Sequence, residues 1–190
     1  MKEFWTSDNH FGHKNIITYC KRPFLTADGQ PDSQAMNRTM IERWNSVVGP
    51  RDTVFNVGDF SMANVAQVRD YRKKLNGKII LVRGNHDRNA QGMLQAGFEE
   101  VHDNLTIVRD GLTIYMSHVP MFPTGPEERE LRAGQKRRQY AKELIQKPPN
   151  FFHHFFCGHV HEKWKKRGKI TNVGVDQWDF TPRTLEELLP

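Results

Sequence analysis

The chain has 190 residues, of which 37% are hydrophobic and 26% are charged, and it carries a formal net charge of +6. This size and composition predict one globular domain over residues 1–190 and exclude disordered, collagen-like and coiled-coil proteins. The longest apolar runs are strand-length and fall far short of the roughly 20 residues that cross a bilayer, so no membrane partner is expected.

The expected secondary structure alternates between strands and helices, which predicts an α/β protein. Asp32 and Ser33 begin a helix that Gly49 and Pro50 end, with apolar residues at near-helical spacing between them. In chain order we expect a strand at 4–7, a helix at 33–48, a strand at 53–57, a helix at 65–75, a strand at 78–82, hairpin strands at 106–108 and 112–116, a basic helix at 127–146, strands at 151–156 and 169–173, and a polar tail.

Five of the expected strands end in turns that present Asp, Asn or His side chains. These residues are Asp8 and His10, Asp59, the run Asn85, His86 and Asp87, then His118, and last the pair His159 and His161. In sheets whose faces are covered by helices, ligand sites collect at one end of the strands. Residues far apart in the sequence can therefore converge there.

The chemistry of this set indicates transition metals. Two carboxylates, one amide oxygen and four imidazoles suit Mn, Fe, Co, Ni or Zn and are too rich in nitrogen for a dedicated Ca or Mg cage. Seven donors are too many for one ion, and they divide into two sites of about four if one carboxylate bridges. Two ions about 3.5–4 Å apart can activate a bridging water for in-line displacement at phosphorus.

The order of these motifs resembles that of the calcineurin-like metallophosphoesterase superfamily, in particular its small single-domain bacterial and phage members. The stretches TSDNHFGHKNI and NVGVDQWDFTPRTLEEL are similar to that small-phosphoesterase group as well. The resemblance implies a four-layer α/β sandwich, in which two central mixed β-sheets are flanked by helices.

The resemblance also implies a role for each site residue. It assigns Asp8, His10 and His161 to one ion, Asn85, His118 and His159 to the other, and Asp59 to both as a bridge. It makes His86 the catalytic imidazole near the leaving-group oxygen and Asp87 the partner that orients it. The implied cofactors are two divalent ions, Mn, Ni, Fe, Co or Zn, with Mn favoured.

The expected activity is hydrolysis of phosphodiester bonds by a hydroxide that bridges the two ions. Two basic segments, 127–147 with net charge +3 and 162–170 with net charge +4, favour nucleotide or nucleic-acid substrates. A phosphomonoesterase acting on a nucleotide or a phosphoprotein is the nearest alternative. A non-catalytic module that binds metal or nucleic acid is the alternative from another class.

The compartment expected from the sequence is the cytoplasm. The first ten residues, MKEFWTSDNH, contain no apolar signal segment. Cys20 and Cys157 are far apart in the sequence and are expected to be free thiols, as is usual in a reducing compartment.

Overall fold

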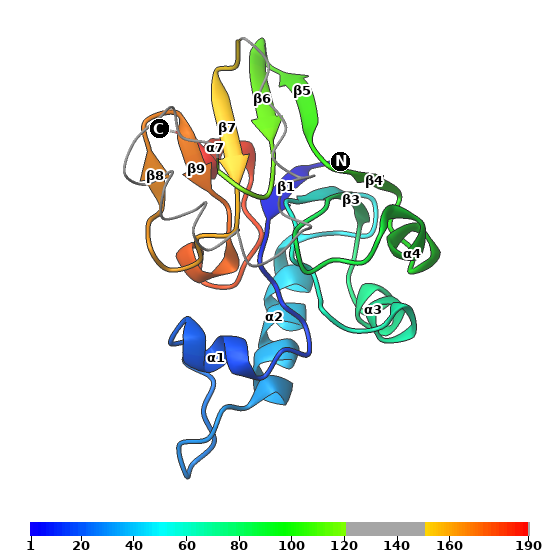
Figure 1. Cartoon of the computed structure of the whole chain (residues 1–190). Helices are drawn as coiled ribbons and strands as arrows, with labels where there is room; N and C mark the ends of the chain where they lie inside the picture. The colour runs from blue at the N-terminus through cyan, green and yellow to red at the C-terminus, as the bar shows by residue number, and fades with distance from the viewer. Residues whose placement is uncertain (121–150, 190) are drawn as a thin grey trace.

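The structure is a computed structural model, and it describes residues 1–120 and 151–189. Its first sheet is parallel throughout and has the strand order β1-β2-β3-β4 (Figure 1). The bounds of these strands are Glu3–Thr6 for β1, Thr53–Asn56 for β2, Lys78–Val82 for β3 and Glu100–His102 for β4.

The second sheet is mixed and has the order β5-β6-β7-β9-β8. Its strands are Leu105–Arg109 for β5, Leu112–Met116 for β6, His154–Cys157 for β7, Lys166–Arg167 for β8 and Ile170–Asn172 for β9. Strands β6, β7 and β9 are parallel to one another, whereas β5 and β8 pair antiparallel at the two edges. Because neighbouring strands are parallel, the loops that follow β1, β2 and β3 lie at one edge of the first sheet, and those that follow β6, β7 and β9 lie at one edge of the second.

The two sheets pack against each other through a buried apolar layer. Side chains alternate between the faces of a strand, so Trp5 and Phe55 of the first sheet join Met116 and Phe156 of the second in one cluster. The Trp5 ring stacks on Phe55 with 5.2 Å between centroids and meets Phe156 edge-on at 5.9 Å. This layer lies beneath the loops that carry the polar residues.

Three helices cover the other face of the first sheet: α2 (Ser33–Val47), α3 (Val65–Arg72) and α4 (Ala90–Gln95). The side chain of Asp32 accepts a hydrogen bond from the backbone of Ala35 and so caps α2. Met36, Met40 and Trp44 follow at intervals of four residues and are buried on one side of the helix. That face fixes α2 against the sheet.

The α/β sandwich predicted from the resemblance is confirmed, with one difference in detail. The first sheet is parallel throughout, whereas the prediction had both sheets mixed, because its strands are joined by helical crossovers rather than hairpins. The helix expected at 127–146 lies outside the described residues. Cys20 and Cys157 are free and buried, as expected.

The segment after β9, expected to be a polar tail, is folded. It contains η1 (Val175–Gln177) and α7 (Leu185–Leu188), and the backbones of Trp5 and Arg183 hydrogen-bond to each other. Leu185 and Leu188 are buried in the layer between the sheets. Their neighbours are polar and their spacing is irregular, so periodicity did not reveal these elements.

The remaining differences concern short elements. The helix α1 (Asn15–Tyr19) and the elements α4, β4 and β8 were not expected, since two to six residues show no clear period. Strand β7 begins at His154 rather than at 151, and α3 ends at Arg72 rather than at 75.

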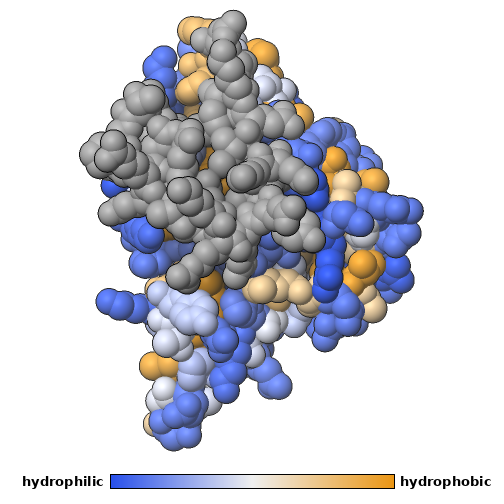
Figure 2. All heavy atoms as spheres, viewed as in Figure 1, coloured by the Kyte–Doolittle hydropathy of each residue, from blue (hydrophilic) through white to orange (hydrophobic). Residues whose placement is uncertain are grey.

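Two surface properties complete the description. Figure 2 shows that the described surface on this side is mainly hydrophilic, with apolar residues scattered over it. In residues 1–120 and 151–189 no helix has the length and apolar content needed to cross a bilayer.

Candidate metal centre

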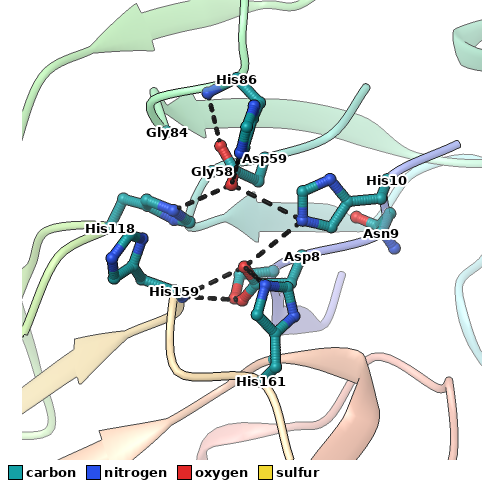
Figure 3. Close-up of polar contacts among 12 residues, drawn as sticks. Asp8, Asn9, His10, Gly58, Asp59, Gly84, His86, His118, His159 and His161 are labelled. Atoms are coloured by element: carbon teal, nitrogen blue, oxygen red, sulfur yellow. Dashed lines mark hydrogen bonds and ion pairs between the residues drawn. The ribbon is translucent and has the colours of Figure 1, made fainter. Parts of the chain in front are cut away.

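The polar residues singled out in the sequence lie together, at the carboxyl ends of strands from both sheets. Asp8 and His10 follow β1, Asp59 follows β2, Asn85 and His86 follow β3, His118 follows β6, and His159 and His161 follow β7. In Figure 3 the carboxylates of Asp8 and Asp59 point toward the centre, and the histidines surround them. The site therefore joins loops from the whole length of the described chain.

The backbone at this site is held in an unusual conformation. Left-handed φ values are uncommon for residues other than glycine, and they concentrate where function requires a strained geometry. Five of the expected ligands have them: Asp8 (57°), His10 (50°), Asp59 (53°), His159 (71°) and His161 (47°). Each of these turns directs its side chain back toward the strand ends.

Glycines allow the loops to approach one another closely. A Cβ on Gly84 would overlap the carboxylate of Asp59, and a Cβ on Gly158 would overlap that of Asp8. Gly58 has φ +94°, and a Cβ there would lie 2.6 Å from Nδ1 of His118, too close for any other residue. The motif glycines thus make the space in which the two carboxylates sit.

The carboxylate of Asp8 faces two imidazoles. Its Oδ1 is 4.0 Å from Nε2 of His10 and 3.8 Å from Nε2 of His161. The backbone N–H of His159 donates to both carboxylate oxygens at 3.1 Å and fixes their orientation. Asp8, His10 and His161 therefore form one converging set.

The carboxylate of Asp59 lies between imidazoles from different loops. Its Oδ2 is 3.2 Å from Nε2 of His118, 3.6 Å from Nε2 of His10 and 3.9 Å from Nε2 of His86. Its Oδ1 accepts a hydrogen bond of 2.8 Å from the backbone N–H of His86. One oxygen of Asp59 therefore lies between His10 and His118.

The rings of His118 and His159 meet edge-on with 5.3 Å between centroids, and Asn85 contacts His159. Nδ1 of His118 lies 2.8 Å from the carbonyl oxygen of Val57, which can only accept, so this nitrogen carries the proton and Nε2 faces Asp59. Nδ1 of His159 is 3.1 Å from Oδ1 of Asn85. Both imidazoles are thus oriented by neighbours from other loops.

Burial and the nearby carboxylates shift the pKa values of the imidazoles in opposite directions. Burial opposes protonation of His118, yet Asp59 raises its pKa to about 9. Burial likewise opposes protonation of His161, but Asp8 and Asp176 raise its pKa to about 11. Burial lowers the pKa of His159 to about 3 and that of His10 well below its usual value. The carboxylates thus supply a strongly attractive field for positive charge.

The donor set fits divalent metal ions. Both ring nitrogens of His10 and Nε2 of His118 are buried without a hydrogen-bond partner in the described part of the chain, although His118 faces Asp59 as an ion pair. Three groups of three residues each bring one ligand atom per residue within 4.8 Å of one another. Two of them consist of predicted ligands, namely Asp8, His10 and His161, and Asp8, Asp59 and His118, and the third is Cys20, His161 and Asp176.

Asp87 ties two of the loops together. Its carboxylate accepts hydrogen bonds from the backbone N–H groups of Gly84 at 2.8 Å, Asp59 at 2.8 Å and Phe60 at 2.9 Å. Asp87 thus holds the loop after β2 against the loop after β3, which carries His86. Direct orientation of the His86 ring by Asp87 stays a prediction.

Comparison with known proteins agrees with this geometry. The family model described as the calcineurin-like phosphoesterase superfamily domain matches residues 1–176. The chain belongs to the calcineurin-like phosphoesterase superfamily. Membership supports phosphoester hydrolysis and the use of divalent metals, in agreement with the resemblance seen in the sequence.

Relatives of this calcineurin-like chain occur in bacteria, archaea and phages. A protein of unknown function from Aquifex aeolicus has 26% identity and a TM-score of 0.68, and the match covers 98% of this chain and 97% of that one. The Gene 66 protein of Mycobacterium phage L5 is 26% identical over 94% of this chain and 88% of its own. An uncharacterized protein of Methanocaldococcus jannaschii is 40% identical, but the match spans about half of each chain, 46% and 47%.

Two residues that support this phosphoesterase site were missed by sequence reasoning. Arg22 is buried and donates through Nε and Nη2 to both oxygens of Asp176, at 2.8 and 2.9 Å. Arg22 also donates to the backbone carbonyls of Asp8, at 2.7 Å, and Asn9, at 3.1 Å. Asp176 in turn lies 3.2 Å from Nδ1 of His161. Arg22 therefore connects the loop that bears Asp8 and His10 with Asp176, the carboxylate that contacts His161.

Nothing in the sequence around Arg22 distinguishes it from a surface arginine. Asp176 lies within the stretch NVGVDQW, but its proximity to His161 depends on the turn after β9.

Replacing Asp176 with asparagine is expected to weaken the binding of one of the two predicted metal ions by roughly 10- to 100-fold. Loss of a carboxylate that orients a ligating imidazole usually lowers metal affinity by this much. Titration with Mn²⁺ should show one weakened and one unchanged binding step. Asp52→Asn is the matched control, since Asp52 accepts from the backbone N–H groups of Lys2 and Gly49 just before β2, at the opposite end of the sheet from the site. Equal weakening of both steps, or of neither, would contradict this role for Asp176.

A pocket of about 420 Å³ opens beside the predicted ligands. His10, His86 and His161 form part of its wall. The rest comes from the α1 region and two loops, namely His13, Ile16, Tyr19, Cys20, Met62, Glu162 and Lys163. This pocket gives a substrate access to His86 and to one edge of the donor set.

Proposed function

We propose that the protein is a phosphodiesterase that depends on two divalent metal ions, with Mn²⁺ favoured. The observation that carries this proposal is the placement of Asp59 Oδ2 between Nε2 of His10, at 3.6 Å, and Nε2 of His118, at 3.2 Å. Such a carboxylate can serve two ions at once, and all its nearest imidazoles come from different loops.

The predicted ligands divide between the two ions. Asp8, His10 and His161 would hold one, Asn85, His118 and His159 would hold the other, and Asp59 would serve both. When bound, two such ions supply positive charge against the phosphoryl oxygens and activate water for attack. The protein's own contribution is to fix these donors and to shape the pocket.

His86 is the proposed catalytic imidazole. Its side chain is 19% exposed, it lines the pocket, and its Nε2 lies 3.9 Å from Asp59. A protonated imidazole in this position can donate a proton to the departing oxygen of the ester. Asp87 supports His86 by holding the loop after β2 against the loop after β3.

The pocket favours a diester over a monoester. Among the described residues that line it, Lys163 is the single lysine or arginine, and Glu162 lies beside it. A dianionic terminal phosphate gains most from additional cations, whereas a monoanionic diester needs fewer. A phosphomonoesterase is therefore the second candidate.

The experiment that tests the proposal compares two chromogenic substrates. Protein stripped with EDTA and refilled with Mn, Ni, Co, Zn or Mg is assayed with bis-p-nitrophenyl phosphate and with p-nitrophenyl phosphate. Metal-dependent cleavage mainly of the diester is the expected result. Preference for the monoester would identify a phosphatase. Absence of turnover despite two bound ions would favour the non-catalytic alternative.

A further inference from the structure

A run of cations leaves the rim of the pocket along one edge of the second sheet. Lys163, Lys165, Lys166, Arg167 and Lys169 all lie within seven residues, and all are exposed. Strand β8, which contains Lys166 and Arg167, is the edge strand beside β9, at the left of Figure 1. We call these five residues the cationic edge.

Two lysines of the cationic edge contact uncharged partners. The ammonium of Lys165 lies over the ring of Trp178, 3.7 Å from its centroid, and that of Lys166 donates to the carbonyl of Leu189 at 3.2 Å. Neither contact neutralises a positive charge. Within residues 1–120 and 151–189 none of the four lysines has a carboxylate at ion-pair distance.

Protection of a sheet edge explains only part of this pattern. Lysines on an edge strand discourage pairing with another chain, and β8 is such a strand. That function does not require Lys163, which precedes the strand and lines the pocket together with His86 and His161. The cationic edge is thus continuous with the candidate metal centre.

The chemistry of the edge suits a single polyanionic strand. Lys163 to Arg167 can span at most about 14 Å when extended, so the cations occupy a narrow edge rather than a broad face. Neighbouring side chains of a strand point to opposite faces, so Lys166 and Arg167 lie on the two sides of this edge. Trp164, partly exposed, lies beside it, and the guanidinium of Arg167 is 5.1 Å from its ring centroid. Cations alternating with an aromatic ring are typical of surfaces that bind single-stranded nucleic acid.

We propose that the cationic edge binds the backbone of a single-stranded nucleic acid, so that an adjoining phosphodiester lies in the pocket. This inference rests on the proposed function and specifies its substrate as an oligonucleotide rather than a mononucleotide.

The test compares two double variants that lose the same charge. Lys166→Gln/Lys169→Gln removes two cations from the edge and leaves Lys163 and the packing of Lys165 on Trp178 intact. Lys73→Gln/Lys74→Gln removes two exposed lysines next to α3. Binding of a fluorescein-labelled 12-residue oligodeoxythymidine to each metal-loaded protein is measured by anisotropy between 50 and 200 mM salt. Each protein is also assayed with bis-p-nitrophenyl phosphate.

The edge variant is expected to flatten the slope of log K against log salt by about 1.4, since each phosphate contact contributes about 0.7 on a single strand. At 50 mM salt its binding should be weaker by roughly 10- to 100-fold, by the same relation. The control variant should match the wild type, and all three should cleave bis-p-nitrophenyl phosphate at the same rate.

Three outcomes would overturn the inference. Equal effects of the two double variants would show that net charge alone matters, and tighter binding of a duplex of the same length would exclude a single-strand site. Binding to vesicles containing phosphatidylserine, without binding to the oligonucleotide, would assign the edge to a membrane surface. Failure of the phosphodiesterase proposal would be seen separately, as lack of cleavage of bis-p-nitrophenyl phosphate by the wild type.

Discussion

Replacing His86 with alanine is expected to leave both metal ions bound and to lower turnover by roughly 10²- to 10⁴-fold, the usual contribution of a positioned proton donor. The reason is geometric. His86 lines the pocket, and it is not among the residues assigned to either ion. Metal content measured by mass spectrometry, together with kcat for bis-p-nitrophenyl phosphate, checks this expectation.

His161→Ala is the matched comparison. The side chains of His86 and His161 have the same exposed fraction, 19%, so both variants remove an imidazole of similar burial. Loss of His161 should release one ion, because its Nε2 faces Asp8 within a converging set. If metal content fell equally in both variants, the proposed division between ligand and proton donor would be wrong.

The largest expected effect on stability comes from Trp5→Ala. Trp5 is 1% exposed, stacks on Phe55 and meets Phe156 from the other sheet. Truncating a buried tryptophan costs about 3–5 kcal/mol in the free energy of unfolding, through lost burial and the cavity that remains. For a domain of this size, each kcal/mol lowers Tm by roughly 2–4 °C.

Trp5→Phe separates packing from polarity. The indole Nε1 of Trp5 is buried without a hydrogen-bond partner in the described residues, so phenylalanine removes an unsatisfied donor while keeping an aromatic ring. We expect it to cost less than Trp5→Ala, because phenylalanine leaves a smaller cavity than alanine does. Thermal unfolding of both variants measures the difference. A similar loss of Tm in the two would show that ring stacking is not the source of stability.

The strands and the site loops could be predicted because their signals are local. The run from Lys78 to Val82 is apolar throughout and is followed at once by Asn85 and His86, so the end of the strand marks the start of the site. Motif order then indicated the superfamily, which the family match confirmed. The roles of the individual ligands remain predictions, although the structure brings them together.

Features that depend on contacts between distant segments could not be predicted. Arg22 and Asp176 are separated by 154 positions, and neither has a local pattern that indicates a buried ion pair. The burial of Leu188 depends on the space left between two sheets, which no sequence period describes. The direction of β4 follows from the crossover through α4, a short helix with little periodic signal.

The connection made by Arg22 has a consequence for the order in which the protein matures. Asp8 and His10 leave the ribosome early, whereas His161 and Asp176, which lie at the same proposed ion site, follow more than 150 residues later. The backbone of Ser7 also pairs with that of Gly174, which is equally late in the chain. During synthesis, therefore, the early histidines cannot hold this ion in its final geometry. Metal binding at the proposed site therefore requires synthesis of the chain at least as far as Asp176.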